Sequence, residues 1–259
     1  MNIIILSILV GVAGMGAGAL ITALFGSRTD KMVSIFLSFA GGVMISIVLI
    51  ELIPEAIELS GLIVTVTGLS LGAVIVMLLN NIIDKISKTL RKSTDLHESY
   101  TEYFHSEGLS DKKKGLLKSG MIMLFAIALH NIPEGLAMGA AGYHDYSMGL
   151  TIAIMIGLHN LPEGMAVAAP LVSGGMSKIK AIILVSLIGG TTVIGAALGY
   201  LIGGISYMVL ALSFAAAGGA MLYVVFGEIL PQSIFSNRDK IPTIFALVGI
   251  VVGLLFTQI

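Results

Sequence analysis

The stretch LHNIPEGLAMGAAGYHDYSMGLTIAIMIGLHNLPEG, residues 129–164, decides how this chain folds. It contains nearly the same six letters twice, HNIPEG and HNLPEG. Each copy places a histidine, an asparagine, a proline and a glutamate inside an apolar run. Polar and ionisable residues are rare in such runs because burying them without partners is unfavourable. A polar motif repeated in this setting predicts a functional site.

The surrounding composition is that of a membrane protein. Hydrophobic residues make up 56% of the chain, charged residues 11%, and the mean hydropathy is +1.02. A soluble domain carries about 25% charged residues, so that class is excluded. The apolar runs do not alternate as the strands of a membrane β-barrel would. The fold class is therefore an all-α polytopic membrane protein. The chain has no cysteine, which excludes disulfides and thiolate metal sites.

Apolar runs separated by polar breaks predict eight transmembrane helices in a single domain over residues 1–259. The first run has no basic flank, so we expect a retained helix and not a signal peptide. The expected helices are 3–25, 32–57, 61–84, 118–141, 147–171, 179–203, 206–230 and 241–258.

The basic residues set the expected orientation. All 14 Lys and Arg residues fall in connections that follow an odd-numbered helix, and therefore on one side of the membrane. The positive-inside rule makes that side the cytoplasm, which puts both termini outside a multi-pass cell membrane protein. The longest connection, residues 85–117, is polar and poor in aliphatic residues, so we expect a flexible cytoplasmic loop.

Two internal repeats relate the halves of the chain. GGVMISIVLIELIPEA at residues 41–56 matches GGAMLYVVFGEILPQS at residues 218–233 without gaps. The two HNxPEG motifs form a second pair, and in the expected topology both pairs are inverted copies. Helices 1–4 would then mirror helices 5–8, as in transporters that bind substrate near the membrane midplane. Chance similarity of glycine-rich helices is the alternative for the first pair.

Spacing within the motifs gathers metal-binding groups on one helix face. Residues three or four apart on a helix are neighbours, about 5–6 Å apart at Cβ. Both motifs lie about 18 Å along their helices, close to the middle of a hydrocarbon core of about 30 Å. A glutamate there costs about 2.5–3.5 kcal/mol on the insertion scale, which a bound cation or a shared proton would offset. The side chains are His130, Asn131, Glu134, His159, Asn160 and Glu163.

Imidazole and carboxylate without thiolate suit Zn²⁺, Fe²⁺, Mn²⁺ and their neighbours. The prolines fit this picture, because Pro133 and Pro162 cannot donate to the carbonyls of Leu129 and Leu158 and so free polar oxygens. Two other interpretations stay open: packing kinks with hydrogen-bonded polar residues, and an intramembrane metal-dependent hydrolase. A metalloprotease would show H-E-x-x-H, whereas the motif here is H-x-x-x-E.

With these motifs the chain resembles the ZIP (Zrt/Irt-like protein) family of divalent metal transporters, in its bacterial, broad-range form. The resemblance covers nearly the whole length and rests on HNIPEGLAMGAA and HNLPEGMAVAAPL. It implies import of Zn²⁺ and related ions such as iron, manganese and cadmium toward the cytoplasm. It also implies two three-helix bundles that flank the fourth and fifth helices.

The same resemblance assigns the ligands. His130, Asn131, Glu134, Asn160 and Glu163 match family ligands, and His159 matches a position that often contributes one. Met44 matches a methionine near the site in some members, with plain core packing as the alternative. His97 and His105 lie where family loops are often rich in histidine, and are candidates for regulation.

One position departs from the family pattern. Many members carry a glutamate in the sixth helix, where SLIGGTTVIGAALGY here holds Thr192. A carboxylate there would help to hold a second ion. Its absence predicts a single transported ion or a weaker second one.

Three further glutamates are candidates for the ends of the ion path. Glu51 and Glu55 lie at the outer end of the second helix and could attract cations to an entrance. Glu228, the repeat mate of Glu51, could mark an exit. Ordinary solvated helix ends are the alternative. The expected partners are the lipid bilayer, divalent metal ions as substrate and a second copy in a homodimer. We expect no nucleic acid, no organic cofactor and no enzymatic activity.

Overall fold

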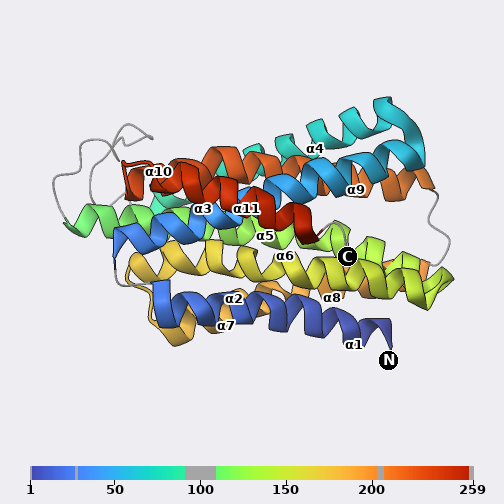
Figure 1. The fold of residues 1–259 in the computed structure, drawn as a ribbon, viewed down its shortest axis with the longest axis horizontal. Coiled ribbons are helices and arrows are strands. Elements are labelled where there is room, and N and C mark those ends of the chain that lie inside the picture. The colour runs from blue at the N-terminus through green and yellow to red at the C-terminus, as the bar shows by residue number, and fades with distance from the viewer. Residues whose placement is uncertain (1, 27–28, 91–108, 203–206, 257–259) are drawn as a thin grey trace.

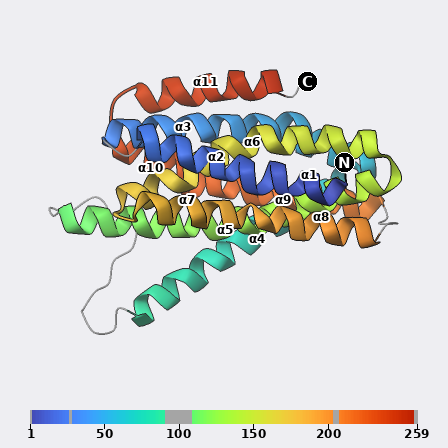
Figure 2. The same cartoon turned by 90° about the horizontal axis from the view of Figure 1, so that it is seen from below.

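The computed structural model describes residues 2–26, 29–90, 109–202 and 207–256, and these residues form helices joined by short turns. Most of the helices run side by side along the longest axis of the molecule, while the later part of α4 is tilted away from the others (Figures 1 and 2). Within the described residues, six helical runs are long and apolar enough to cross a membrane. The protein is therefore an all-helical, multi-pass membrane protein.

The first span is one continuous run, Ile3–Phe25, as the sequence predicts. Two of its four segments are π-helical, with i→i+5 hydrogen bonds that widen the turn. The segments are α1 (Ile3–Ser7), η1 (Ile8–Ala13), α2 (Gly14–Ile21) and η2 (Thr22–Gly26).

A single helical run of 53 residues, Asp30–Ile82, covers the second and third predicted helices. Its segments are α3 (Asp30–Ile47), η3 (Val48–Leu52) and α4 (Ile53–Leu90). Gly61 interrupts the run with φ 78°, a left-handed value that glycine adopts without steric cost. The chain folds back on itself within α4 (Figure 1).

The two motif-bearing helices lie in the interior of the molecule. They are α5 (Leu109–His144) and α6 (Tyr146–Ser173), joined at Asp145, whose carboxylate accepts from the Ser147 backbone N–H at 2.9 Å. α5 begins before the predicted residue 118, and α4 continues to Leu90. Residues 85–90 and 109–117 of the predicted loop are thus helical. Residues 91–108, with His97 and His105, lie outside the described residues, so the predicted flexibility stays a prediction.

The last three predicted spans also appear as helices. Gly189 separates α7 (Lys178–Ile188) from α8 (Gly190–Ile202). The next run consists of α9 (Tyr207–Val224), η5 (Val225–Ile229) and α10 (Leu230–Ser236). α11 (Ile241–Phe256) follows as a shorter apolar helix.

Close helix–helix contacts at glycines occur within two groups of helices. In the first group, a Cβ at Gly135 of α5 would overlap the Thr192 carbonyl of α8, and one at Gly164 of α6 would overlap the Met15 carbonyl of α2. α7 joins this group where Gly189 meets the first span. Only glycine allows backbones to approach so closely.

The second group contains α3, α4, α9 and α11. A Cβ at Gly42 of α3 would overlap the Ala246 carbonyl of α11, and one at Gly72 of α4 would overlap that of Ala216 in α9. Among the described glycines, these backbone approaches occur within a group and not between groups. Each close pair joins a helix from the first half of the chain to one from the second half. These pairs do not define two three-helix bundles beside the motif helices, so that arrangement stays a prediction.

Candidate metal centre

The six motif side chains are buried between α5 and α6. The exposed fractions of His130, Glu134, His159 and Glu163 are 2% or less, and both asparagines are fully buried. The helices continue through Pro133 and Pro162. The structure therefore brings His130, Glu134, His159 and Glu163 together, and it buries Asn131 and Asn160, which follow the two histidines in the sequence. That these residues bind an ion stays a prediction.

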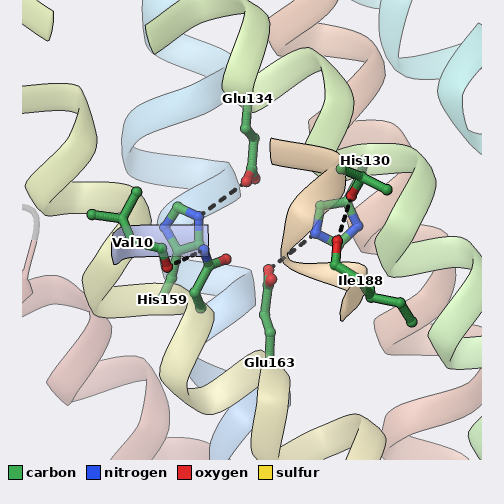
Figure 3. A network of polar contacts seen from close by, with 8 residues as sticks. Val10, His130, Glu134, His159, Glu163 and Ile188 are labelled. Carbon is green, nitrogen blue, oxygen red and sulfur yellow. Dashed lines mark hydrogen bonds and ion pairs between the residues drawn. The ribbon is translucent and has the colours of Figure 1, made fainter. Parts of the chain in front are cut away.

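Each histidine pairs with the glutamate of the other helix. His130 Nε2 on α5 lies 3.1 Å from Glu163 Oε1 on α6, and His159 Nε2 on α6 lies 3.3 Å from Glu134 Oε2 on α5. Figure 3 shows the two carboxylates pointing toward each other between the two imidazoles. Spacing within one helix does not reveal this crossed pairing.

The site has the dimensions of a cation site. One ligand atom from each of His130, Glu134 and Glu163 can be chosen so that all lie within 4.8 Å of one another. Ligands of one zinc ion sit about 2.0–2.2 Å from the metal, so they lie roughly 3–4 Å apart. Only small side-chain movements would close the group around an ion.

Several buried polar atoms of the site have no protein partner. They include both side-chain atoms of Asn131 and one carboxylate oxygen each of Glu134 and Glu163. Buried polar groups in native proteins are nearly always paired with protein, water or an ion. Unpaired oxygens of this kind are acceptors that could bind a divalent cation.

The two asparagines differ in their partners. Asn160 Nδ2 donates to the backbone carbonyl of Val10 in η1 at 2.8 Å, and its Oδ1 is buried without a partner. Sequence reasoning missed Val10, because a backbone acceptor leaves no side-chain signal.

Thr192 lies in the same packed group. It is fully buried, its Oγ1 has no partner, and its carbonyl packs against Gly135 in the Glu134 turn. A neutral hydroxyl thus stands where many family members are expected to have a carboxylate.

The other candidate residues differ in how far they are buried. Glu51, in η3, is partly buried and interacts electrostatically with His159 and Glu134, which places it beside the site. Glu55 is partly exposed. Met44 is fully buried in the main hydrophobic cluster, where its packing matches the core interpretation as well as a ligand one.

Glu228, in η5, is buried in a polar cluster of its own. Asn80 Nδ2 of α4 donates to its Oε1 at 3.4 Å, and Ser119 Oγ of α5 donates to its Oε2 at 3.3 Å. Only 6% of Glu228 is exposed, so it is not a solvated helix end. Sequence reasoning missed Asn80 and Ser119, which are unremarkable polar residues near the ends of apolar runs.

The fold and the site define a multi-pass membrane protein with a buried imidazole and carboxylate centre between two antiparallel helices. The model of the family described as ZIP zinc transporter matches residues 87–259, and the chain belongs to this family. Members of this family are transporters and not enzymes.

Individual relatives match over nearly the full length. A zinc transporter ZupT of Akkermansia muciniphila is 33% identical over 273 residues, which cover 100% of this chain and 97% of the relative. A zinc transporter ZupT of Chlorobium chlorochromatii is 33% identical, with 94% of this chain and 91% of the relative covered. One from Corynebacterium glutamicum is 33% identical, with 92% and 90% covered.

Proposed function

We propose that this protein carries zinc across the membrane toward the cytoplasm through the crossed His–Glu site, and that iron, manganese and cadmium ions share the path. The observation that carries the proposal is the burial of two carboxylates and two imidazoles in paired geometry between α5 and α6. The same chemistry and the names of the relatives support zinc as substrate. The hydrolase alternative has no support among these findings.

We infer a topology of eight helices with both termini outside. The six long runs become eight helices when Asp30–Ile82 is divided at Gly61 and the shorter Ile241–Leu255 is counted. Every Lys and Arg then falls on the cytoplasmic side by the positive-inside rule.

The π-helices support the inverted repeat. η5 (Val225–Ile229) begins 177 residues after η3 (Val48–Leu52), since 225 − 48 is 177. The matching sequence segments that begin at residues 41 and 218 have the same offset. Each carries the glutamate of its repeat at the fourth position and is followed two residues later by a proline. Proline removes a donor from the preceding turn, which is a physical reason for the local widening.

We propose alternating access, and the division into two packed groups supports it. The motif helices belong to the first group, while Glu51 and Glu228 lie in η3 and η5, which continue α3 and α9 of the second group. Movement of one group against the other would expose the site to one end of the path and then to the other. A homodimer in the lipid bilayer is part of the proposal, with the single Thr192 hydroxyl favouring one ion per subunit.

Uptake by liposomes tests the function directly. Purified protein is reconstituted in liposomes that contain a zinc-sensitive dye, and the dye signal should rise when zinc is added outside. Added iron, manganese or cadmium ions should compete and lower the rate of zinc uptake. Empty liposomes are the control. Reconstituted, correctly folded protein that gives no more signal than empty liposomes would overturn the proposal.

A further inference from the structure

The first span accepts a hydrogen bond from one of the motif asparagines. The Val10 carbonyl accepts a hydrogen bond at 2.8 Å from Asn160 Nδ2, across 150 residues of sequence. Val10 lies in the π-helix η1, and π-helical turns occur often at functional sites. The contact therefore ties a motif side chain to an element outside the motif.

This hydrogen bond fixes which end of the Asn160 amide faces the first span. A carbonyl only accepts, so the NH₂ end must point to Val10. The opposite orientation would place two oxygens 2.8 Å apart without a proton between them. The Oδ1 atom consequently points away from Val10, and it is buried without a protein partner.

Packing holds the same turn of α6 against the first span. A Cβ at Gly14 would lie 3.1 Å from Asn160 Cβ, and a Cβ at Gly157 would lie 3.2 Å from Val10 Cγ1. Because both positions are glycine, the first span and this turn of α6 can approach each other closely. The hydrogen bond to Val10 thus sets the orientation of the Asn160 amide, in a turn that packs closely against the first span.

Asn131 of the other motif has no comparable hydrogen bond. Both of its side-chain polar atoms are buried without a hydrogen-bond partner. No hydrogen bond therefore selects one amide orientation over the other.

We propose that the Val10 carbonyl is a positioning group that presents Asn160 Oδ1 to the transported cation. Asn160 then supplies a neutral oxygen in a fixed orientation, and Asn131 an adjustable one. The inference rests on the proposed function, since the cation is the transported one. It requires an amide at position 160, because an aspartate has acceptors only and would face the Val10 oxygen without a donor.

The same substitution at the two equivalent positions tests this. Asn160→Asp and Asn131→Asp each add one carboxylate to the same site. Zinc uptake by reconstituted Asn160→Asp should show a KM raised about tenfold, the effect of losing one buried hydrogen bond. Asn131→Asp should keep or lower the KM. Equal changes in the two variants, or tighter zinc binding by Asn160→Asp, would overturn the proposal.

A variant that leaves both asparagines in place provides a second test. Gly14→Ala should push Asn160 by a few tenths of an ångström and raise the KM about threefold, at an unchanged maximal rate. Gly16→Ala, in the same helix α2, would crowd the Ser186 hydroxyl at 2.5 Å instead of Asn160, so it controls for crowding elsewhere in the helix and should leave the KM unchanged. An unchanged KM in Gly14→Ala would contradict the positioning role.

Failure of the proposed function would be distinguishable from failure of this inference. Wild-type protein without zinc uptake would count against the function. The thermal melting of the metal-free variants would still test the Val10 contact, since only Asn160→Asp loses that hydrogen bond. Equal melting temperatures of the two Asp variants would count against the inference.

Discussion

The two copies of the HNxPEG motif carry nearly the same residues but have different neighbours. In α6, Asn160 is bound by the Val10 carbonyl, and Gly164 packs against Met15 of the first span. In α5, Asn131 has no hydrogen-bond partner, and Gly135 packs against Thr192 of α8. A repeated motif therefore supplies the same side chains twice, while the surrounding helices determine how firmly each side chain is held.

The glutamates have equivalent partners in the two copies, because each pairs with the histidine of the other motif. Their removal should have the largest effect on zinc uptake. Glu134→Ala and Glu163→Ala should each lower zinc uptake by about 100-fold or more, because each removes a ligand and leaves a buried histidine unpaired. Rates of dye-reported uptake by liposomes measure this. Glu58→Ala, on an exposed glutamate of α4, is the control and should retain uptake. Normal uptake in either site variant would remove that glutamate from the site.

The histidines should separate the two copies. His130 belongs to the compact group with Glu134 and Glu163, whereas His159 does not. We predict that His130→Ala weakens zinc binding about tenfold more than His159→Ala does, since the loss of a direct ligand exceeds that of an orienting partner. Competition with a chelator of known affinity measures both. A weaker effect of His130→Ala than of His159→Ala would reverse the assignment.

The motif glycines should be equally intolerant of a side chain. Gly135→Ala and Gly164→Ala each place a methyl group against a carbonyl of a neighbouring helix, which should cost about 1–3 kcal/mol of stability. Thermal melting in detergent measures the loss. Gly190→Ala, where a Cβ meets no atom within 4 Å, is the control. Melting of either motif variant at the wild-type temperature would show that the helices separate easily there.

Thr192 should have the smallest effect of the four. Thr192→Val keeps the shape and removes a hydroxyl without a hydrogen-bond partner, so the KM for zinc should change by less than about threefold. Uptake kinetics measure the change. A loss of transport would instead make the threonine oxygen a ligand.

Much of the fold could be predicted from the sequence, because long apolar runs indicate which segments cross the membrane. The residues at which helices begin and end are predicted less well from hydropathy. α5 begins at Leu109 because polar residues such as those before Lys118 extend a helix beyond the apolar region at no burial cost.

The sequence predicts that the histidines and glutamates of the two motifs meet, but it does not predict which histidine pairs with which glutamate. Their role as metal ligands stays a prediction. The ligand types follow from two motifs at similar depth, but the pairing of His130 with Glu163 depends on how α5 and α6 are aligned, which no single-helix spacing contains. The contact from Val10 is a backbone interaction and depends on a distant segment. The hydrogen bonds to Glu228 likewise join three helices that are far apart in sequence.

If the crossed His–Glu site is correct, both motifs hold one and the same ion. Equilibrium dialysis of purified protein against zinc tests this most directly, with the wild type beside Glu134→Ala and Glu163→Ala. We expect one tightly bound zinc per wild-type chain and loss of that ion in each single variant. Two equivalent ions in the wild type, with one retained in each variant, would show that each motif binds its own metal and would contradict the shared site.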